Sequence, residues 1–230
     1  RVIEYLIQNP QPNLEFAINT NACPPGETQW KEFVDRVKIL EDNNCIKRFV
    51  LFVSAEGKGA QQEYNRYGMD WTMFTDNVKY YLKQTTGRCV FMSAFNVLSI
   101  PTFLPFLKYV ARLKGGYENE IVVDIPYVRS PGFLDAKIAS DELIKEYLHP
   151  CIPYMEEKNF NNREKAQMKR IVKDLDLRHA NSDNWKQEAI EGRRMFYEWI
   201  QQYDKRRDLN FLEVFPQMED FYEECKKCMI

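Results

Sequence analysis

The 230-residue sequence lacks both long hydrophobic runs and a strong excess of one charge. No apolar run approaches the roughly 20 residues that a membrane-spanning helix needs, so we expect no contact with a membrane interior. Lys and Arg together number 32 and Asp and Glu number 34, which gives a net charge of −2. Because nucleic-acid-binding domains usually carry a basic excess, this balance argues against a nucleic-acid partner.

Several short catalytic motifs are also missing. The sequence contains no G-x-x-x-x-G-K-[ST] phosphate loop, no G-x-S-x-G nucleophile turn and no H-E-x-x-H zinc helix. Its only two histidines, His149 and His179, fall near expected helix ends, where we expect them to be ordinary surface residues with no catalytic role. These absences argue against the P-loop nucleotide hydrolases, the common serine hydrolases and the common zinc proteases.

No secretory signal opens the chain, which begins Arg1-Val2-Ile3-Glu4. The six cysteines are therefore expected to be free thiols in a reducing compartment, and we expect a cytoplasmic protein. The chain also lacks an initiator Met and begins inside an expected helix, which we interpret as a fragment or a trimmed chain. The cysteines stand at positions 23, 45, 89, 151, 225 and 228.

Hydrophobic patterning in the first half predicts strands that alternate with amphipathic helices. The run Phe49–Val53 is continuously apolar, which is typical of a strand buried on both faces of a parallel sheet. This strand ends at Ser54-Ala55-Glu56-Gly57, and a polar loop is expected after it, through Gly68. Strand–helix alternation at this spacing predicts right-handed crossovers and a parallel sheet. The expected strands are 14–18, 46–53, 89–95 and 120–125, and the expected helices are 28–43, 70–83 and one from Ile100 onward.

After about residue 140 no strand candidate remains. Apolar residues at helical spacing predict three amphipathic helices, over 163–178, 185–203 and 211–222. We therefore divide the chain into an α/β domain at 1–139 and a helical C-terminal extension at 140–230.

Polar residues gather where the expected strands end. Ligands of parallel α/β folds bind beyond the carboxyl ends of the strands. Any one of these residues could serve a turn for backbone reasons, but we expect the set to form a polar ligand site. The set comprises Asn19, Thr20, Asn21, Ser54, Glu56, Asn96, Asp124, Tyr127 and Arg129.

Cys225-Lys226-Lys227-Cys228 has the C-x-x-C spacing of half a metal or cluster site. One pair does not complete a site, and Cys23 and Cys151 are the only additional ligands that we consider. Cys225 and Cys228 are therefore kept as candidate metal ligands.

The strand-end segments resemble those of the radical S-adenosylmethionine (radical SAM) enzymes. Ile18-Asn19-Thr20-Asn21 resembles the "TN" end of their fourth strand. FVLFVSAEGKGAQQEYNRYG, at 49–68, resembles their fifth-strand region with its R-x-G. MDWTMFTDNVKYYL and CVFMSAFNVLSIPTFLPFL resemble the next helix and the sixth strand with its helix. YDKRRDLNFLEVFPQMEDFYEEC, at 203–225, resembles the C-terminus of the subgroup with a twitch domain.

The resemblance implies an α/β fold, an incomplete (β/α) barrel of parallel strands followed by an α-helical C-terminal region. It implies S-adenosylmethionine as a cofactor, with Ser54 contacting its ribose or carboxylate and Arg66 pairing with its carboxylate. Further cofactor contacts are implied for Asn19, Asn21 and Asn96. The residues implied to face a substrate of unknown identity are Asp124, Tyr127 and Arg129.

The family holds its catalytic [4Fe–4S] cluster with a C-x-x-x-C-x-x-C motif, which this sequence lacks, as it lacks anything resembling strands one to three. Because the cluster supplies the electron for radical formation, we expect this chain alone to be catalytically incomplete, with the cluster bound by a full-length protein. Two alternatives stay open: a non-catalytic binding or assembly module on a barrel remnant, and a small-molecule transferase.

If strands one to three are missing, segment 14–18 is a sheet edge and the inner face of the barrel is uncovered. Exposed edges and apolar faces invite pairing with another chain. We expect either a homodimer through this edge or a helix of the 163–222 region folded over it.

Overall fold

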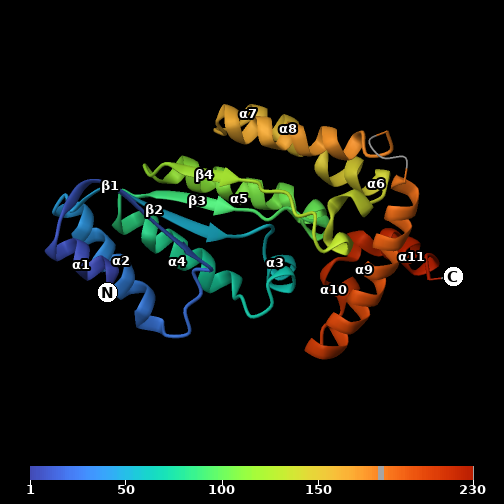
Figure 1. Ribbon diagram of the computed structural model, residues 1–230, viewed down its shortest axis with the longest axis horizontal. Coiled ribbons are helices and arrows are strands. Elements are labelled where there is room, and N and C mark those ends of the chain that lie inside the picture. Colours follow the sequence, from blue (N-terminus) through green and yellow to red (C-terminus); the bar gives the residue numbers. More distant parts are fainter. Residues whose placement is uncertain (181–183, 230) are drawn as a thin grey trace.

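The computed structural model describes residues 1–180 and 184–229 (Figure 1). The strands are β1 (Gln11–Thr20), β2 (Ile46–Ser54), β3 (Arg88–Met92) and β4 (Ile121–Asp124). The helices are α1 (Val2–Gln8), α2 (Glu27–Asp42), α3 (Ala60–Asn65), α4 (Trp71–Gln84), α5 (Phe103–Gly116), α6 (Asp141–Leu143), α7 (Cys151–Glu157), α8 (Asn162–Asp176), α9 (Trp185–Arg207), α10 (Phe211–Val214) and α11 (Glu219–Lys227).

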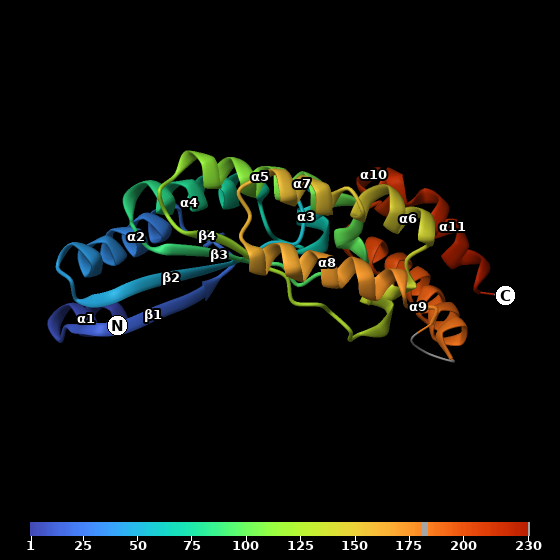
Figure 2. The same cartoon turned by 90° about the horizontal axis from the view of Figure 1, so that it is seen from above.

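The four strands form one sheet in the order β1-β2-β3-β4, and every neighbouring pair is parallel. The parallel α/β fold expected from the sequence is confirmed. Phe49, Leu51 and Val53 are fully buried, on the face that α2, α4 and α5 cover (Figure 2). Successive right-handed crossovers place these helices on the same face. Whether the sheet belongs to a barrel stays a prediction.

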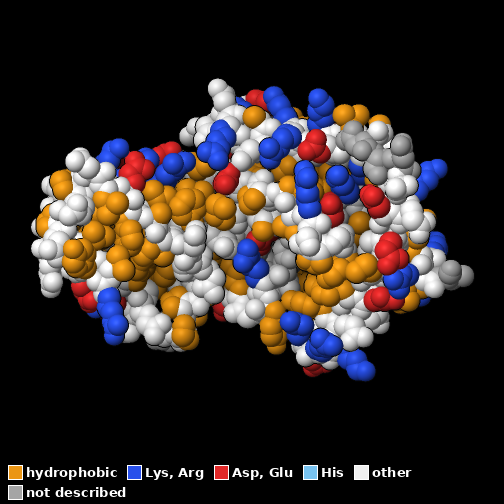
Figure 3. All heavy atoms as spheres, viewed as in Figure 1, with side chains coloured by type: hydrophobic (Ala, Val, Ile, Leu, Met, Phe, Trp, Pro, Cys, Tyr) orange, Lys and Arg blue, Asp and Glu red, His pale blue; other side chains and the backbone are white. Residues whose placement is uncertain are grey.

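The opposite face of the sheet, here called the open face, is covered mainly over β4 by α8 (Figure 2). Val50, Val90 and Val122 form a small buried cluster there, separate from the main core, and Phe52 and Met92 pack on it half-buried. Hydrophobic atoms reach the surface in the half of the molecule that holds β1 to β3 (Figure 3). The sheet therefore has one helix-covered face and one partly accessible apolar face.

The helices α9, α10 and α11 lie beyond the carboxyl ends of the strands (Figure 1). The Tyr64 hydroxyl at the end of the sheet donates to Asp204 Oδ1 at 2.6 Å, and the Tyr203 hydroxyl donates to the Tyr64 carbonyl at 2.7 Å. One continuous core of buried residues runs from Leu6 to Cys225. The helical region thus packs against the carboxyl end of the sheet, and the domain boundary at residue 139 stays a prediction.

The carboxylate of Glu164, on α8, covers the outer edge of β4. Its Oε1 accepts a hydrogen bond from the Val123 backbone N–H at 2.8 Å, and its Oε2 pairs with Lys114 Nζ at 2.8 Å. Glu164 is 0% exposed and Lys114 is 7% exposed. Because a side chain occupies the position where another strand would bond, the sheet ends at β4.

At the other edge, β1 is hydrogen-bonded to β2 alone within the described residues. The expectation that a helix of the 163–222 region folds over segment 14–18 is wrong, because α8 lies along β4 instead. The Glu164 carboxylate in the first turn of α8 accepts a hydrogen bond from the Val123 N–H, which holds α8 at the β4 edge of the sheet. A homodimer through β1 stays a prediction.

Two local expectations need correction. The loop expected between Gly57 and Gly68 contains the short helix α3. The single helix expected over 211–222 is broken into α10 and α11, because Pro216 has no backbone N–H and restricts Phe215, whose φ and ψ are −123° and 59°. In the described part of the chain, no helix combines the length and apolarity that crossing a membrane requires.

Replacing Glu164 tests the anchoring of α8. Glu164→Ala leaves a buried Lys114 ammonium without its counter-charge and the Val123 N–H without an acceptor, so we expect a loss of about 3–5 kcal/mol in the free energy of unfolding. Urea unfolding measures it. The control is Glu156→Ala, which removes a pair with Lys169 at the surface and should cost at most about 1 kcal/mol. Equal losses for the two variants would contradict the anchoring role.

Candidate functional site

Three of the predicted site residues share the open face at the carboxyl ends of the strands. Asn19 lies opposite Phe52, Ser54 lies opposite Met92, and Met92 lies opposite Asp124. Paired residues point to the same side of a sheet, and so do residues two apart on one strand. Asn19, on an exposed position, and the half-buried Ser54 and Asp124 therefore line one rim of the open face.

Arg66 is engaged in an ion pair with Glu56. Arg66 Nε donates to Glu56 Oε2 at 2.7 Å, and Arg66 Nη2 donates to Oε1 of the same carboxylate. Gln62 Nε2 donates to Glu56 Oε2 at 3.2 Å, and Gln62 Oε1 accepts from the Glu56 N–H at 2.9 Å. Glu56 is 2% exposed and Arg66 is 34% exposed. The pair is bidentate, and water reaches only its arginine side.

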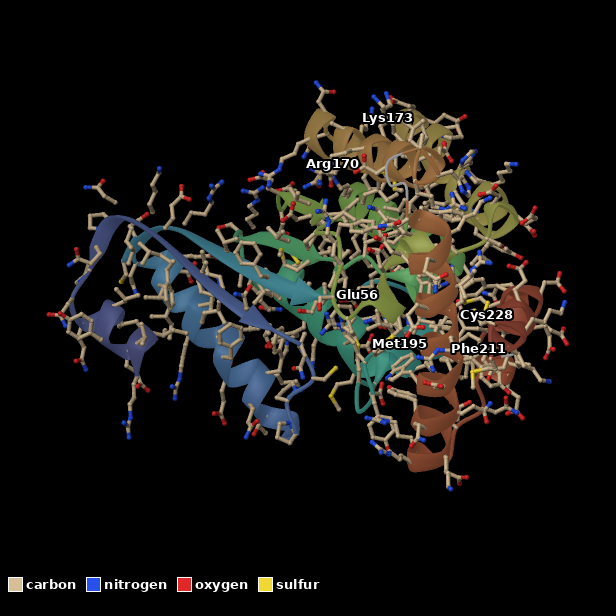
Figure 4. All side chains as sticks on the ribbon, turned by 45° about the vertical axis from the view of Figure 1, so that its right-hand side comes forward. Glu56, Arg170, Lys173, Met195, Phe211 and Cys228 are labelled. Carbon is tan, nitrogen blue, oxygen red and sulfur yellow. The ribbon has the colours of Figure 1, made fainter. Side chains whose placement is uncertain are left out.

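The turn that carries Glu56 is fixed by close backbone packing. A Cβ at Gly57 would lie 2.4 Å from Thr102 Cγ2, so only glycine fits there without displacing Thr102. The next residue, Lys58, donates its backbone N–H to Thr102 Oγ1 at 3.1 Å, and Gly59 has a φ of +62°, which glycine adopts readily. These contacts explain why Glu56 points back to the sheet end, between the strands and the C-terminal helices (Figure 4).

The amide side chains of Asn21 and Asn96 bond to nearby backbone. Asn96 Oδ1 accepts from the Leu98 N–H at 2.9 Å and its Nδ2 donates to the Ala94 carbonyl at 3.1 Å, with the residue 6% exposed. Asn21 Oδ1 accepts from the Cys23 N–H at 3.2 Å on an exposed turn. Asn21 directly follows β1, whereas β3 ends at Met92 and Asn96 lies four residues further on, so the expected strand end at residue 95 is wrong. Asn96 already uses both ends of its amide.

Of the three residues predicted to face a substrate, Asp124 is the last residue of β4, and Tyr127 and Arg129 lie in the segment after it. Asp124 Oδ1 accepts from Gln167 Nε2 at 2.6 Å and from Arg163 Nη2 at 3.4 Å. The Tyr127 hydroxyl donates to Asp135 Oδ1 at 2.6 Å. Burial is the larger cause, and this hydrogen bond the smaller one, that raises the pKa of Tyr127. Arg129 is exposed and lines two neighbouring cavities of about 350 and 300 Å³.

Cys225 lies in the last turn of α11 and Cys228 follows the end of that helix. Cys228 lies apart from Glu56 at the sheet end (Figure 4). Cys225 is fully buried in the core, and burial raises the pKa of its thiol. Cys228 Sγ donates to the Glu224 carbonyl at 3.4 Å. Among the described residues no three or more His, Cys, Asp or Glu side chains gather as metal ligands. Two cysteines do not fit a cluster that requires three, and their role as metal ligands stays a prediction.

Residues that the sequence analysis missed also lie at this end of the sheet. Lys137 and Arg170 line the larger cavity beside Arg129, and Gln62 holds Glu56. A signal for the α8 residues was present, because Gln167, Arg170 and Asp174 recur at helical spacing beside the apolar stripe. Comparison of the chain with protein-family models, curated proteins and solved structures finds no match.

Removing Arg66 should destabilise the fold because it leaves the buried Glu56 carboxylate without a counter-charge. We expect Arg66→Ala to lower the free energy of unfolding by about 3 kcal/mol. Adding Glu56→Gln should recover more than about 1 kcal/mol of that loss, since no buried charge then remains. Denaturant unfolding of the two single variants and the double variant gives their free energies of unfolding, which together form a double-mutant cycle.

The matched control for this cycle is Arg36→Ala, which breaks an exposed pair with Glu4 and should change stability by no more than about 1 kcal/mol. Purely additive losses for Arg66→Ala and Glu56→Gln would show that the two side chains do not depend on each other.

Proposed function

We propose that the chain supplies later strands of a radical SAM enzyme and binds S-adenosylmethionine at the carboxyl ends of those strands. The observation that supports this most directly is the shared position of Asn19, Ser54 and Asp124 on the open face. Three polar side chains from three strands line the end where parallel α/β folds bind ligands. The substrate of the full enzyme is unassigned.

Each rim residue has a chemistry that suits this cofactor. The Ser54 hydroxyl can donate to or accept from a ribose hydroxyl or a carboxylate, and the Asn19 amide can do the same. Phe52 lies half-buried beside Asn19, and Met92 lies half-buried between Ser54 and Asp124, so both offer apolar area to an adenine ring.

Arg66 would approach the cofactor carboxylate with the part of its guanidinium that Glu56 leaves open. Its Nε and Nη2 are held by Glu56, and Nη1 donates no hydrogen bond within the described residues. A guanidinium fixed on one side is pre-oriented for a second anion on the other, which lowers the entropy lost on binding. Glu56 is then a positioning residue for Arg66.

A [4Fe–4S] cluster, if a full-length protein holds one, would supply the electron that cleaves the cofactor. In this proposal the residues of this chain bind and orient the cofactor. We propose no reaction step through Cys225 and Cys228, because both lie at the end of α11 and the Cys225 thiol is buried in the core.

A second candidate function is an assembly module, and the single-sided pairing of β1 favours it. In that case β1 would join a strand of another chain. Sedimentation should then show a dimer of this chain that Ala17→Lys weakens, because an edge lysine opposes strand pairing. Ala17 is exposed, so the fold should tolerate the change. A monomer at all concentrations would contradict the homodimer.

S-adenosylmethionine binding tests the first proposal by calorimetry. We expect weak binding that Asn19→Ala and Ser54→Ala each reduce about 2- to 10-fold, which corresponds to one lost hydrogen bond. Asn13→Ala is the control, since Asn13 is an equally exposed asparagine at the other end of β1. No detectable binding, or equal weakening by Asn13→Ala and Asn19→Ala, would contradict a cofactor site at the carboxyl ends.

A further inference from the structure

A cavity between α8 and the segment after β4 gathers positive charge. It measures about 350 Å³ and is lined by Tyr127, Arg129, Lys137, Arg170, Ile171 and Asp174. The cations come from two separate parts of the chain, the segment at 129–137 and α8. Its volume is within the range of small-molecule sites in proteins.

The three cations of this cavity have no ion-pair partner within 4.0 Å among the described residues. This contrasts with Arg66, Lys114 and Arg163, which are all paired. Against three positive charges the cavity wall carries one negative charge, that of Asp174. The lining is therefore two charges positive, although the whole chain is two charges negative.

A net charge of two matches a phosphate monoester, which carries close to two negative charges at neutral pH and offers three strong acceptor oxygens. Arginine guanidinium groups and a lysine ammonium are the side chains that bind phosphate most strongly in proteins. A carboxylate would neutralise only half of this charge. The overall acidic balance of the chain disfavours an extended nucleic-acid backbone as the source of the phosphate.

A second cavity adjoins the first, because Arg129 and Lys137 line both. It measures about 300 Å³ and lies against the first turns of α9, where Trp185, Ala189 and Met195 supply apolar area. The carboxylates of Asp135, Glu188 and Glu191 also line this second cavity, so the positive excess belongs to the first cavity alone. The Trp185 Nε1 is buried and has no hydrogen-bond partner among the described residues. In Figure 4, Arg170 lies on α8 and Met195 on α9, on the two helices that bound this paired space.

We propose that the two cavities bind one phosphorylated small molecule. Its phosphate lies in the first cavity and contacts Arg129, Lys137 and Arg170. The rest of the molecule extends into the cavity against α9, along the apolar area of Trp185, Ala189 and Met195. The binding itself is independent of S-adenosylmethionine. Its assignment as the substrate rests on the proposed function, since Asp124 of the rim is bound to Gln167, one turn before Arg170 on α8.

Titration calorimetry at pH 7.5 with three probes tests the ligand class. Phenyl phosphate carries both the dianion and an apolar ring, inorganic phosphate carries the dianion alone, and benzoate carries one charge and the ring. We expect affinity to fall in the order phenyl phosphate, inorganic phosphate, benzoate, and to fall with added salt. Benzoate binding as tightly as phenyl phosphate would overturn the phosphate assignment.

Substitutions on α8 test the position. Arg170→Gln should weaken phenyl phosphate at least 10-fold, because it removes a charge-assisted hydrogen bond. Lys173→Gln changes the net charge equally at an exposed position on the same helix, outside the cavity lining (Figure 4), and should change affinity less than 2-fold. Lys137→Gln should weaken binding as Arg170→Gln does. Equal effects of Arg170→Gln and Lys173→Gln would overturn the site.

The same proteins separate this inference from the proposed function. Arg170→Gln should leave S-adenosylmethionine affinity unchanged, and Ser54→Ala should leave phenyl phosphate affinity unchanged. Phosphate binding without S-adenosylmethionine binding contradicts only the proposed function. S-adenosylmethionine binding with no response to any of the three probes contradicts only the phosphate site.

Discussion

The buried carboxylate of Glu164 is the contact on which the arrangement of the two halves depends. It accepts from the backbone of Val123, from Lys114 and, at 2.6 Å, from the N–H of Asn161 at the start of its own helix. A buried carboxylate is tolerated only when its lone pairs are used. Once these donors are met, the start of α8 is fixed against β4. Gln167 then reaches Asp124, and Arg170 and Asp174 lie one and two turns further along the same side.

The sheet could be predicted because its causes are local in the sequence. The apolar run at Phe49–Val53 and its spacing from the amphipathic helices indicate buried parallel strands without any knowledge of tertiary contacts. The break at Phe215–Pro216 could also have been predicted, because a helix usually ends before a proline. The apolar spacing, taken alone, predicted one continuous helix instead. These features depend on residues that are near one another in the chain.

The ion pairs and the cavities could not be predicted in the same way. Glu164 reads as an ordinary acidic residue in the first turn of a helix, and its burial depends on Lys114, fifty positions earlier. The family resemblance assigns Arg66 to the cofactor carboxylate, and nothing in the sequence indicates its ion pair with Glu56, ten positions away. The cavity cations Lys137 and Arg170 meet only after α8 has packed, although the strand-end residues Asn19, Ser54 and Asp124 could be placed from the strands alone.

Charge is distributed unevenly over the carboxyl end of the sheet. Glu56 neutralises Arg66 close to β2, whereas Arg129, Lys137 and Arg170 beyond β4 have no ion-pair partner within 4.0 Å among the described residues. A ligand with a charged and a less charged end would therefore be oriented along the rim by the field as well as by contacts. This charge difference depends on the low exposure of Glu56. If the Glu56 carboxylate were exposed, solvent ions would screen its charge, and it would neutralise Arg66 less.

The closed edge at β4 and the free edge at β1 also restrict which symmetries an assembly can have. Two copies joined through β1 by a twofold axis meet with the same surface patch on both sides. If that axis is perpendicular to the sheet, the two β1 strands run antiparallel with their helix layers on one side. If it runs along the strands, they are parallel and the helix layers fall on opposite sides. Neither arrangement forms a closed barrel of parallel strands. Such a barrel requires a strand at β1 that comes from a different segment or a different protein.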